Sequence, residues 1–438
     1  MARRFWLGLV MTSGCLMPNP RWDGASGSGD GSDDGASGAS GGDTQGNSGA
    51  ASATGSATNA SAGGTGNTDA TDTATTGGES GSGITISGSG DHTCIAFEGQ
   101  AWCWGAGTDG QIGDGANADR LAPVQVPNLT SVTMVSSGHL HTCAIASGEA
   151  WCWGAGSSGQ LGQGVQDSSA VPVPVALPDG EVTSISAGLA FTCAVVSSKA
   201  YCWGTNGTGQ LGTGAGTTTF AVPQVVSMFP SGVQMVDAGN DHACAIVDGA
   251  AYCWGHNDGG VGLGAGIGDG SSALPLPVVG MDTGVSQISI GGWGGCALRD
   301  GGAWCWGVGG NGELGDGNNS DSGVPVQPVG METGVTWVRR DGGPVDGDAP
   351  CAVLDHQMYC WGNNAAGRLG DGTTETRSKP TLIDLPAPVE TTGGGLEHNC
   401  AVLVDGRVFC SGRGDRGQLG DGTGVDSPSP VEVTPNWL

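Results

Sequence analysis

Fifteen cysteines stand among the 438 residues, and 14 of them fall into seven closely spaced pairs. The partners are separated by eight residues in six pairs and by nine in the last, and successive pairs start 49 to 55 residues apart. Such thiols could close disulfides or bind a metal, but zinc sites usually show Cys-x2-Cys or closely spaced Cys and His, and neither spacing occurs. We therefore predict no metal site and seven disulfides: Cys94–Cys103, Cys143–Cys152, Cys193–Cys202, Cys244–Cys253, Cys296–Cys305, Cys351–Cys360 and Cys400–Cys410.

Three other polar or aromatic features recur with the cysteines, and each has a structural interpretation. Histidine precedes the first cysteine by two residues in four copies, but Phe191 or Gly294 fills that place in two others, so we expect it to satisfy a neighbouring backbone group. The Trp pairs around the second cysteine are expected to pack between repeats. Aspartates that follow a glycine-rich loop, Asp114, Asp316, Asp371 and Asp421, are expected to cap turns, because no Asp-x-Asp-x-Asp-Gly calcium loop appears.

Each cysteine pair requires a β-hairpin to position it. A two-residue turn at Ser147-Gly148 would place Cys143 directly opposite Cys152, at a non-hydrogen-bonded pair where side chains approach closely. Cβ atoms so placed suit a disulfide. The same count centres other turns on Glu98-Gly99, Asp248-Gly249 and Asp300-Gly301, which are favourable hairpin dipeptides, and the seventh copy has an extra residue near Asp405-Gly406.

The hairpin is half of a larger repeat. A Gly-Gln-Leu-Gly loop, a Pro-Val-x-Val segment and a short β-branched run follow it, so each copy offers four strands. Four strands in each of seven copies predict an all-β, seven-bladed β-propeller over residues 84–438. The first copy has no Pro-Val-x-Val segment ahead of it and the last is followed by one at Pro430 to Val433, so we expect the C-terminal strand to complete the first blade.

These elements resemble a known family. His-Thr-Cys-Ala-Ile, Tyr-Cys-Trp-Gly and Gly-Gln-Leu-Gly-Asp-Gly are similar to the repeats of the regulator of chromosome condensation family, over about 355 residues. The resemblance implies a seven-bladed propeller. It does not imply one activity, because that family includes nucleotide exchange factors, inhibitors of β-lactamase and bacterial surface proteins.

The N-terminus predicts export. Arg3 and Arg4 precede a short apolar run and then Thr12-Ser13-Gly14-Cys15, which resembles a bacterial lipoprotein signal with Cys15 as the acylated residue. An ordinary cleaved signal peptide or a weak signal anchor are the alternatives. Cys15 is also the cysteine that the seven pairs leave over. We expect an outer-membrane or cell-surface lipoprotein, or otherwise a periplasmic or secreted protein, and the abundance of cysteine agrees with an oxidising compartment.

Residues 16–83 and the overall charge restrict the partners. This segment is nearly all Gly, Ser, Ala, Thr, Asn and Asp, which predicts a disordered tether between a signal at 1–15 and the propeller. The formal net charge of −28 argues against nucleic acid, which requires clustered Lys and Arg.

Functional residues are expected where the copies differ. Copy four has a longer loop from His256 that includes Asp258, copy five has Trp293 among glycines, and copy six has an insertion from Arg339 and Arg340 to Pro350. We take these five residues as candidate partner contacts and predict a monomeric binding or adhesion platform with no catalytic residue and no cofactor. Its partner would be a basic protein or a surface ligand. One alternative is a lyase or hydrolase that uses a propeller face, for which His256 and Asp258, close together in the sequence, are the candidate acid and base groups. The other alternative is a guanine-nucleotide exchange factor.

Overall fold

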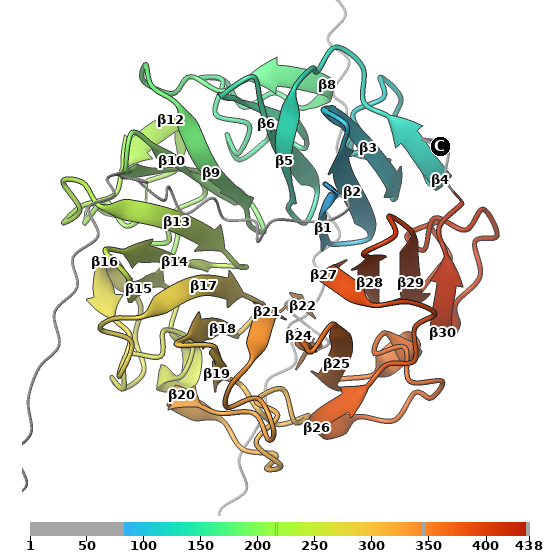
Figure 1. Cartoon of the computed structure of the whole chain (residues 1–438). Coiled ribbons are helices and arrows are strands. Elements are labelled where there is room, and N and C mark those ends of the chain that lie inside the picture. The colour runs from blue at the N-terminus through green and yellow to red at the C-terminus, as the bar shows by residue number, and fades with distance from the viewer. Residues whose placement is uncertain (1–82, 215, 217, 341, 344–346, 435–438) are drawn as a thin grey trace, which may run out of the picture. The chain divides into compact units, whose positions relative to one another are not determined.

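The computed structural model describes residues 83–434 except 215, 217, 341 and 344–346. The predicted signal segment with Cys15 and the predicted tether, apart from Gly83, therefore lie outside the described residues. Within them, the strands form seven four-stranded antiparallel sheets around a central axis (Figure 1) and one two-stranded hairpin. The all-β, seven-bladed prediction is confirmed. The described residues contain no helix long and apolar enough to cross a membrane.

Each blade uses four strands in chain order, and only the sixth blade contains an additional pair within the described ranges. The first four blades are β1 (Thr85–Ser89), β2 (His92–Phe97), β3 (Gln100–Gly105), β4 (Arg120–Gln125); β5 (Val132–Ser137), β6 (His141–Ala146), β7 (Glu149–Gly154), β8 (Ser169–Pro174); β9 (Val182–Ala187), β10 (Phe191–Val196), β11 (Lys199–Gly204), β12 (Phe220–Val225); and β13 (Val233–Ala238), β14 (His242–Val247), β15 (Ala250–Gly255), β16 (Ser272–Pro277). The last three are β17 (Val285–Ile290), β18 (Gly294–Arg299), β19 (Gly302–Gly307), β20 (Ser322–Val326); β21 (Val335–Arg339), β24 (Cys351–Leu354), β25 (Gln357–Gly362), β26 (Arg377–Leu382); and β27 (Val389–Gly394), β28 (His398–Leu403), β29 (Val408–Gly412), β30 (Ser427–Glu432). The additional hairpin is β22 (Gly342–Gly343) with β23 (Gly347–Asp348), and two 3-10 turns are η1 (Asp258–Gly260) and η2 (Ala365–Gly367).

The cysteine hairpin forms the second and third strands of each blade, in the predicted register. Cys143 pairs with Cys152 and Ala146 with Glu149 around the Ser147-Gly148 turn. Both turn residues have positive φ, 53° and 79°, as a type I′ turn requires. All seven predicted disulfides are formed, with Cα atoms 4.0 to 4.1 Å apart. Seven disulfides indicate an oxidising environment.

The expectation that the C-terminal strand completes the first blade is wrong. Strand β30 pairs with β29 and completes blade seven, while β1 to β4 form blade one. The Pro-Val-x-Val segment is the last, outermost strand of a blade, and the β-branched run is the first, innermost one (Figure 1). A period of about 50 residues gives the spacing of the blades but does not show which strand begins a blade. The sequence alone therefore does not determine the boundary between one blade and the next.

The ring closes by side-by-side packing of the first and last blades. Ile84, Ile86 and Trp104 share one buried cluster with residues of the last blade that include Val402 and Leu419. The other buried clusters likewise combine apolar side chains from two adjacent blades. The core is therefore a circle of seams between blades, and residues that recur in every blade are expected to lie in these seams.

Candidate partner-binding site

Two sets of loops meet at one end of the propeller. Because adjacent strands in a blade are antiparallel, the loops between the first and second strands and between the third and fourth strands lie at the same end. We call this end the long-loop face. Trp293, His256, Asp258 and the insertion of copy six all belong to its loops.

The second Trp of each pair is buried in a seam and is structural. The Trp104 and Trp153 side chains are fully buried, and their indole N–H groups donate to the carbonyl oxygens of Gln418 and Gln111 in the preceding blade at 3.0 and 2.9 Å. The same donation is made by Trp203, Trp254, Trp306 and Trp361. Packing between repeats is the predicted role.

The recurring histidines also lie in the seams, where His242 has the expected backbone hydrogen bond, with Gly294 of the next blade, and the others have a different partner. His141 Nε2 lies 2.9 Å from Thr192 Oγ1 in the next blade, and His398 Nε2 lies 2.6 Å from Thr93 Oγ1 across the closure of the ring. The partner of His141 and His398 is thus a threonine side chain and not the backbone. Burial lowers the pKa of these two imidazoles to about 3, because a charged ring would lose its hydration there.

The loop aspartates cap turns, as the sequence predicts. Asp371 and Asp421 each accept a hydrogen bond at 3.0 Å from the backbone N–H group two residues further along, and Asp114 and Asp316 do the same. Among the residues described, no three His, Cys, Asp or Glu side chains are placed to share a metal ion.

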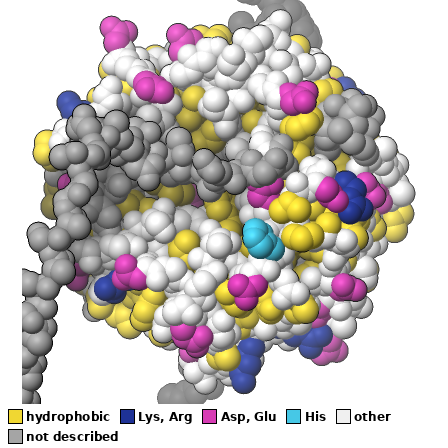
Figure 2. All heavy atoms as spheres, viewed as in Figure 1, with side chains coloured by type: hydrophobic (Ala, Val, Ile, Leu, Met, Phe, Trp, Pro, Cys, Tyr) yellow, Lys and Arg dark blue, Asp and Glu magenta, His cyan; other side chains and the backbone are white. Residues whose placement is uncertain are grey.

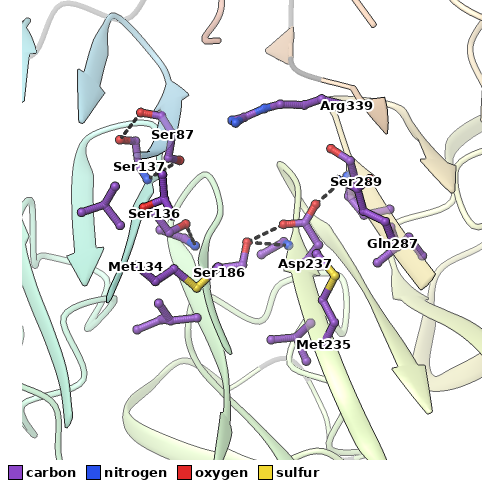
Figure 3. Close-up of a pocket in the computed structure, with 18 of the residues that line it drawn as sticks. Ser87, Met134, Ser136, Ser137, Ser186, Met235, Asp237, Gln287, Ser289 and Arg339 are labelled. Atoms are coloured by element: carbon purple, nitrogen blue, oxygen red, sulfur yellow. Dashed lines mark hydrogen bonds between the residues drawn. The ribbon is translucent and has the colours of Figure 1, made fainter. Parts of the chain in front are cut away.

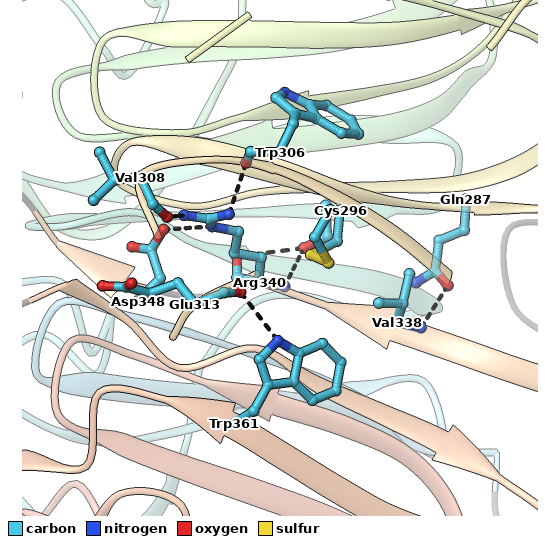
Figure 4. The surroundings of a disulfide bond; sticks show 11 residues. Gln287, Cys296, Trp306, Val308, Glu313, Val338, Arg340, Asp348 and Trp361 are labelled. Atoms are coloured by element: carbon cyan, nitrogen blue, oxygen red, sulfur yellow. Dashed lines mark hydrogen bonds and ion pairs between the residues drawn. A yellow bond between two sulfur atoms is a disulfide. The ribbon is translucent and has the colours of Figure 1, made fainter. Parts of the chain in front are cut away.

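Arg340 belongs to the interior, so its prediction as a partner contact is wrong. Its side chain is fully buried and forms an ion pair with Asp348 at 2.5 Å (Figure 4). Its guanidinium also donates to the carbonyl oxygens of Trp306 and Val308 at 2.7 and 3.0 Å. Gly294 stands where other blades have the seam histidine, and a Cβ there would lie 3.1 Å from Arg340 Cζ, so the guanidinium occupies the space that an imidazole fills elsewhere.

The insertion is consequently part of the seam between blades five and six. Asp348 also accepts a hydrogen bond from the Gly292 backbone N–H group at 3.0 Å, and Arg368 donates to the Gly347 carbonyl oxygen at 3.2 Å. Removing one partner of a buried ion pair leaves an uncompensated charge, which is strongly destabilising. We infer that the insertion as a whole cannot be shortened without disturbing the ring.

Arg339 lies on the wall of the central cavity and not on the long-loop face. It is half-buried, and its Nη2 donates to the Gly88 carbonyl oxygen of blade one at 2.9 Å. Of the five candidate contacts, Arg339 and Arg340 therefore hold blades together.

Trp293 and His256 come together on the long-loop face. Their ring centroids are 5.8 Å apart with planes inclined by 58°, and both side chains are half-buried. Asp258 follows within the same loop and is exposed in η1. No hydrogen bond or ion pair joins His256 to Asp258 in the described part of the chain, and the short helix presents the carboxylate to solvent.

A further carboxylate, Asp241, belongs to this group and was missed from the sequence. Its backbone carbonyl oxygen accepts the backbone N–H of His256 at 2.8 Å. Burial raises the pKa of its half-buried carboxyl group, and the charge of His256 opposes that rise. Asp241 holds the loop position in blade four that Trp293 holds in blade five. Aligning the loops between the first and second strands would have placed the two side by side.

The Trp293 backbone is held firmly although its side chain is half-exposed. Its carbonyl oxygen accepts the Val308 N–H at 3.1 Å, and a Cβ on Gly294 or Gly307 would come within 2.2 or 2.3 Å of backbone oxygens. The neighbouring glycines thus permit close packing and do not loosen the loop. A rigid, half-exposed indole is a suitable anchor for a partner, because little entropy is lost when it is buried.

A family model decides the affiliation of the chain. The regulator of chromosome condensation (RCC1) repeat matches residues 98–145, 147–195, 198–246, 355–402 and 405–436. The chain belongs to the RCC1 repeat family. A comparison with curated proteins found no sequence match.

Solved RCC1-like propellers show the same fold. Human WBSCR16 is 21% identical with a TM-score of 0.68, covering 77% of this chain and 94% of its own. Yeast RCC1 (Prp20), in a structure with Kap60, is 20% identical with a TM-score of 0.67, covering 76% and 83%. Prp20p of Saccharomyces cerevisiae, described with its binding to Gsp1p and histones, has the same identity and score and covers 78% and 87%. Propellers of this family thus include protein-binding modules.

The RCC1 repeat matches leave one long interior segment uncovered, residues 247–354. This segment contains His256, Asp258, Trp293 and the insertion. The part of the ring that departs most from the family repeat is therefore the part that carries the candidate site.

Proposed function

We propose that this protein is an extracytoplasmic, monomeric, non-catalytic platform that binds a basic protein through Trp293, His256, Asp241 and Asp258. The observation that carries the proposal is the coincidence of a rigid, half-exposed Trp293 with the segment that the family repeat does not match. Residues that build the seams are occupied in holding the ring, so an acquired contact is expected where the repeat is broken.

The charge distribution supports a cationic partner. Between residues 132 and 334 the sequence has 15 Asp and Glu but only Lys199 and Arg299 as cations. Figure 2 shows Asp and Glu side chains spread around one face of the propeller. Such a surface attracts cationic proteins and repels nucleic acid. A lysine or arginine of the partner could lie against the Trp293 ring with Asp241 and Asp258 nearby, a combination of cation–π and charge attraction.

Capture experiments with matched variants test this site. We expect Trp293→Ala to weaken retention of the partner by at least about tenfold, since buried aromatic anchors commonly contribute 2 kcal/mol or more. Leu140→Ala is the control, because Leu140 is exposed at the same loop position of blade two. The measurement is the quantity of each basic protein that the immobilised wild type and the two variants retain from intact cells, at two salt concentrations. Equal retention by all three proteins would move the site elsewhere.

The membrane tether is a separate part of the proposal and rests on Cys15. All other cysteines are paired in the structure, so Cys15 remains for acylation. We expect Cys15→Ser to move the protein from the membrane fraction to the soluble exported fraction, as judged by immunoblotting, while Cys15→Ser/Trp293→Ala differs from it only in capture. A wild type that is already soluble would replace the lipoprotein with a secreted protein.

A further inference from the structure

One position of the innermost strand lies opposite the first cysteine of the hairpin in every blade. The residues there are Ser87, Ser136, Ser186, Asp237, Ser289, Arg339 and Gly393, and all but Gly393 line the central cavity. We call this set the cysteine-opposite ring. Where the residue is serine, its hydroxyl accepts a backbone N–H of the next blade, as Ser136 does from Ala187 at 3.0 Å. The structural duty of the ring is thus to join neighbouring blades.

Asp237 also joins neighbouring blades, and its carboxylate can accept a further hydrogen bond. One oxygen accepts the Ile290 N–H at 2.6 Å, and the other accepts the Ser186 hydroxyl at 2.7 Å (Figure 3). The Ala238 backbone N–H also bonds to this carboxylate, and since a carboxylate offers about four lone-pair sites, about one remains. Since serine suffices in four other blades, the charge of Asp237 is not needed to join blades. Burial raises the pKa of this carboxyl group, and the positive charge of Arg339 opposes that rise.

Arg339, in contrast, is committed to the wall. Its guanidinium reaches past Gly393, where a Cβ would lie 3.2 Å from Nη1, and donates to carbonyl oxygens of the two blades beyond. The distances are 2.9 Å to Gly88, 3.4 Å to Ile86 and 3.5 Å to Gly394. Figure 3 shows Asp237 and Arg339 reaching into the same space from β13 and β21. Asp237 therefore remains as a hydrogen-bond acceptor in the cavity, whereas the Arg339 guanidinium donates to carbonyl oxygens of the wall.

The remaining walls favour an elongated cation. The cavity has a volume of about 1320 Å³, and Glu181 and Glu390 also line it, so its described carboxylates outnumber its guanidinium. Met134, Met235 and Trp337 supply apolar surface for a hydrocarbon chain. The Thr85 Oγ1 atom, which can accept a hydrogen bond from an ammonium group, is buried without a hydrogen-bond partner in the described residues.

We propose that the central cavity binds an organic cation with primary ammonium groups on an alkyl chain, one ammonium donating to Asp237. Charge-assisted hydrogen bonds to a half-buried carboxylate are stronger than neutral ones. The walls of low dielectric constant and the acidic protein around them concentrate cations in such a cavity. This site is independent of the partner-binding site on the long-loop face.

Calorimetric titration of the full-length protein with spermidine at low ionic strength tests the proposal. Wild type is expected to bind saturably, and Asp237→Ser to bind at least about tenfold more weakly, because serine preserves the interblade bond and removes only the charge. Asp248→Asn is the charge-matched control, since Asp248 is exposed in the turn of the same blade, and its affinity should stay within about twofold of wild type. Tetramethylammonium, which has no N–H donor, should not compete.

A gain-of-function variant covers the case in which Asp237→Ser folds poorly. Ser136→Asp recreates in blade two the arrangement of Asp237, with Ser87 before it and the Ala187 N–H after it, and should tighten spermidine binding severalfold. Unchanged affinity in both variants, or no saturable binding by the wild type, would overturn the proposal. Loss of partner capture in Trp293→Ala with spermidine binding intact would confirm that the two sites are separate.

Discussion

Reduction of the disulfides is expected to unfold the propeller in a single step. Each disulfide closes a loop of about ten residues, and the chain-entropy model gives about 2–3 kcal/mol for a loop of that size. Folded domains are stable by only about 5–15 kcal/mol, so the loss of a few disulfides removes most of the stability. Each cysteine also lies in a cluster shared with an adjacent blade, so relaxation of one hairpin loosens its neighbour.

The 14 disulfide-bonded cysteines are at most 3% exposed, which determines how reduction should proceed. A reductant cannot reach buried disulfides until the ring opens, so native protein in dithiothreitol should lose them slowly and together. Pulsed alkylation followed by mass spectrometry should detect molecules with either no free propeller thiol or 14. The control is the same incubation with oxidised dithiothreitol. A stable species with a few reduced hairpins and native fluorescence would contradict the shared-seam account.

The hairpins could be predicted from the sequence because all their determinants are local. Ser147-Gly148 specifies a turn, the turn specifies the register, and the register places Cys143 opposite Cys152. The number of blades followed from the seven copies of the cysteine pair, and the family resemblance implied the same number. Contacts between residues about 50 positions apart are harder to predict, because the sequence does not show which loop of one blade contacts which loop of the next.

The errors arose at such contacts between blades. An arginine in an insertion is usually a surface residue. Arg340 is buried because Gly294 leaves a space for its guanidinium in the adjacent seam, and this space exists only in the assembled ring. Strand β30 was assigned to blade one because a repeat has no intrinsic starting point. In the candidate site, Trp293, His256 and Asp258 were found as departures from the repeat. Asp241 was missed because its loop looked ordinary until it was compared with the loop of Trp293.

Acidification is expected to destabilise the propeller steeply below about pH 6.5, because four seam histidines must stay neutral when folded. Burial lowers the pKa of His92, His141 and His398 to about 3 and that of His242 to about 4. An unfolded histidine takes up its proton near pH 6.5. Between these values the unfolded state binds more protons, so the free energy of unfolding falls by about 1.4 kcal/mol per pH unit for each histidine.

The carboxylates modify this dependence at lower pH. The raised pKa values of Asp91 and Asp241 oppose the loss of stability on acidification, since these carboxylates bind protons more readily in the folded state than in the unfolded state. The lowered pKa values of Asp119 and Asp371 add to it, but only as the pH falls below about 4, where these groups protonate when unfolded. The histidines therefore dominate between about pH 6.5 and 4.

The chain itself provides the variant that tests this account. In the seam between blades three and four, Phe191 replaces the histidine and Ala243 replaces the threonine, so the apolar pair packs where others form a hydrogen bond. The double variant His141→Phe/Thr192→Ala copies that seam and removes one titrating group. Urea unfolding, followed by tryptophan fluorescence from pH 7 to 4.5, should show a pH slope smaller by about 1.4 kcal/mol per unit than in wild type. His356→Gln, at an exposed turn, is the control for removal of a histidine outside the seams. Equal slopes for the double variant and wild type would mean that the seam histidines do not control acid stability.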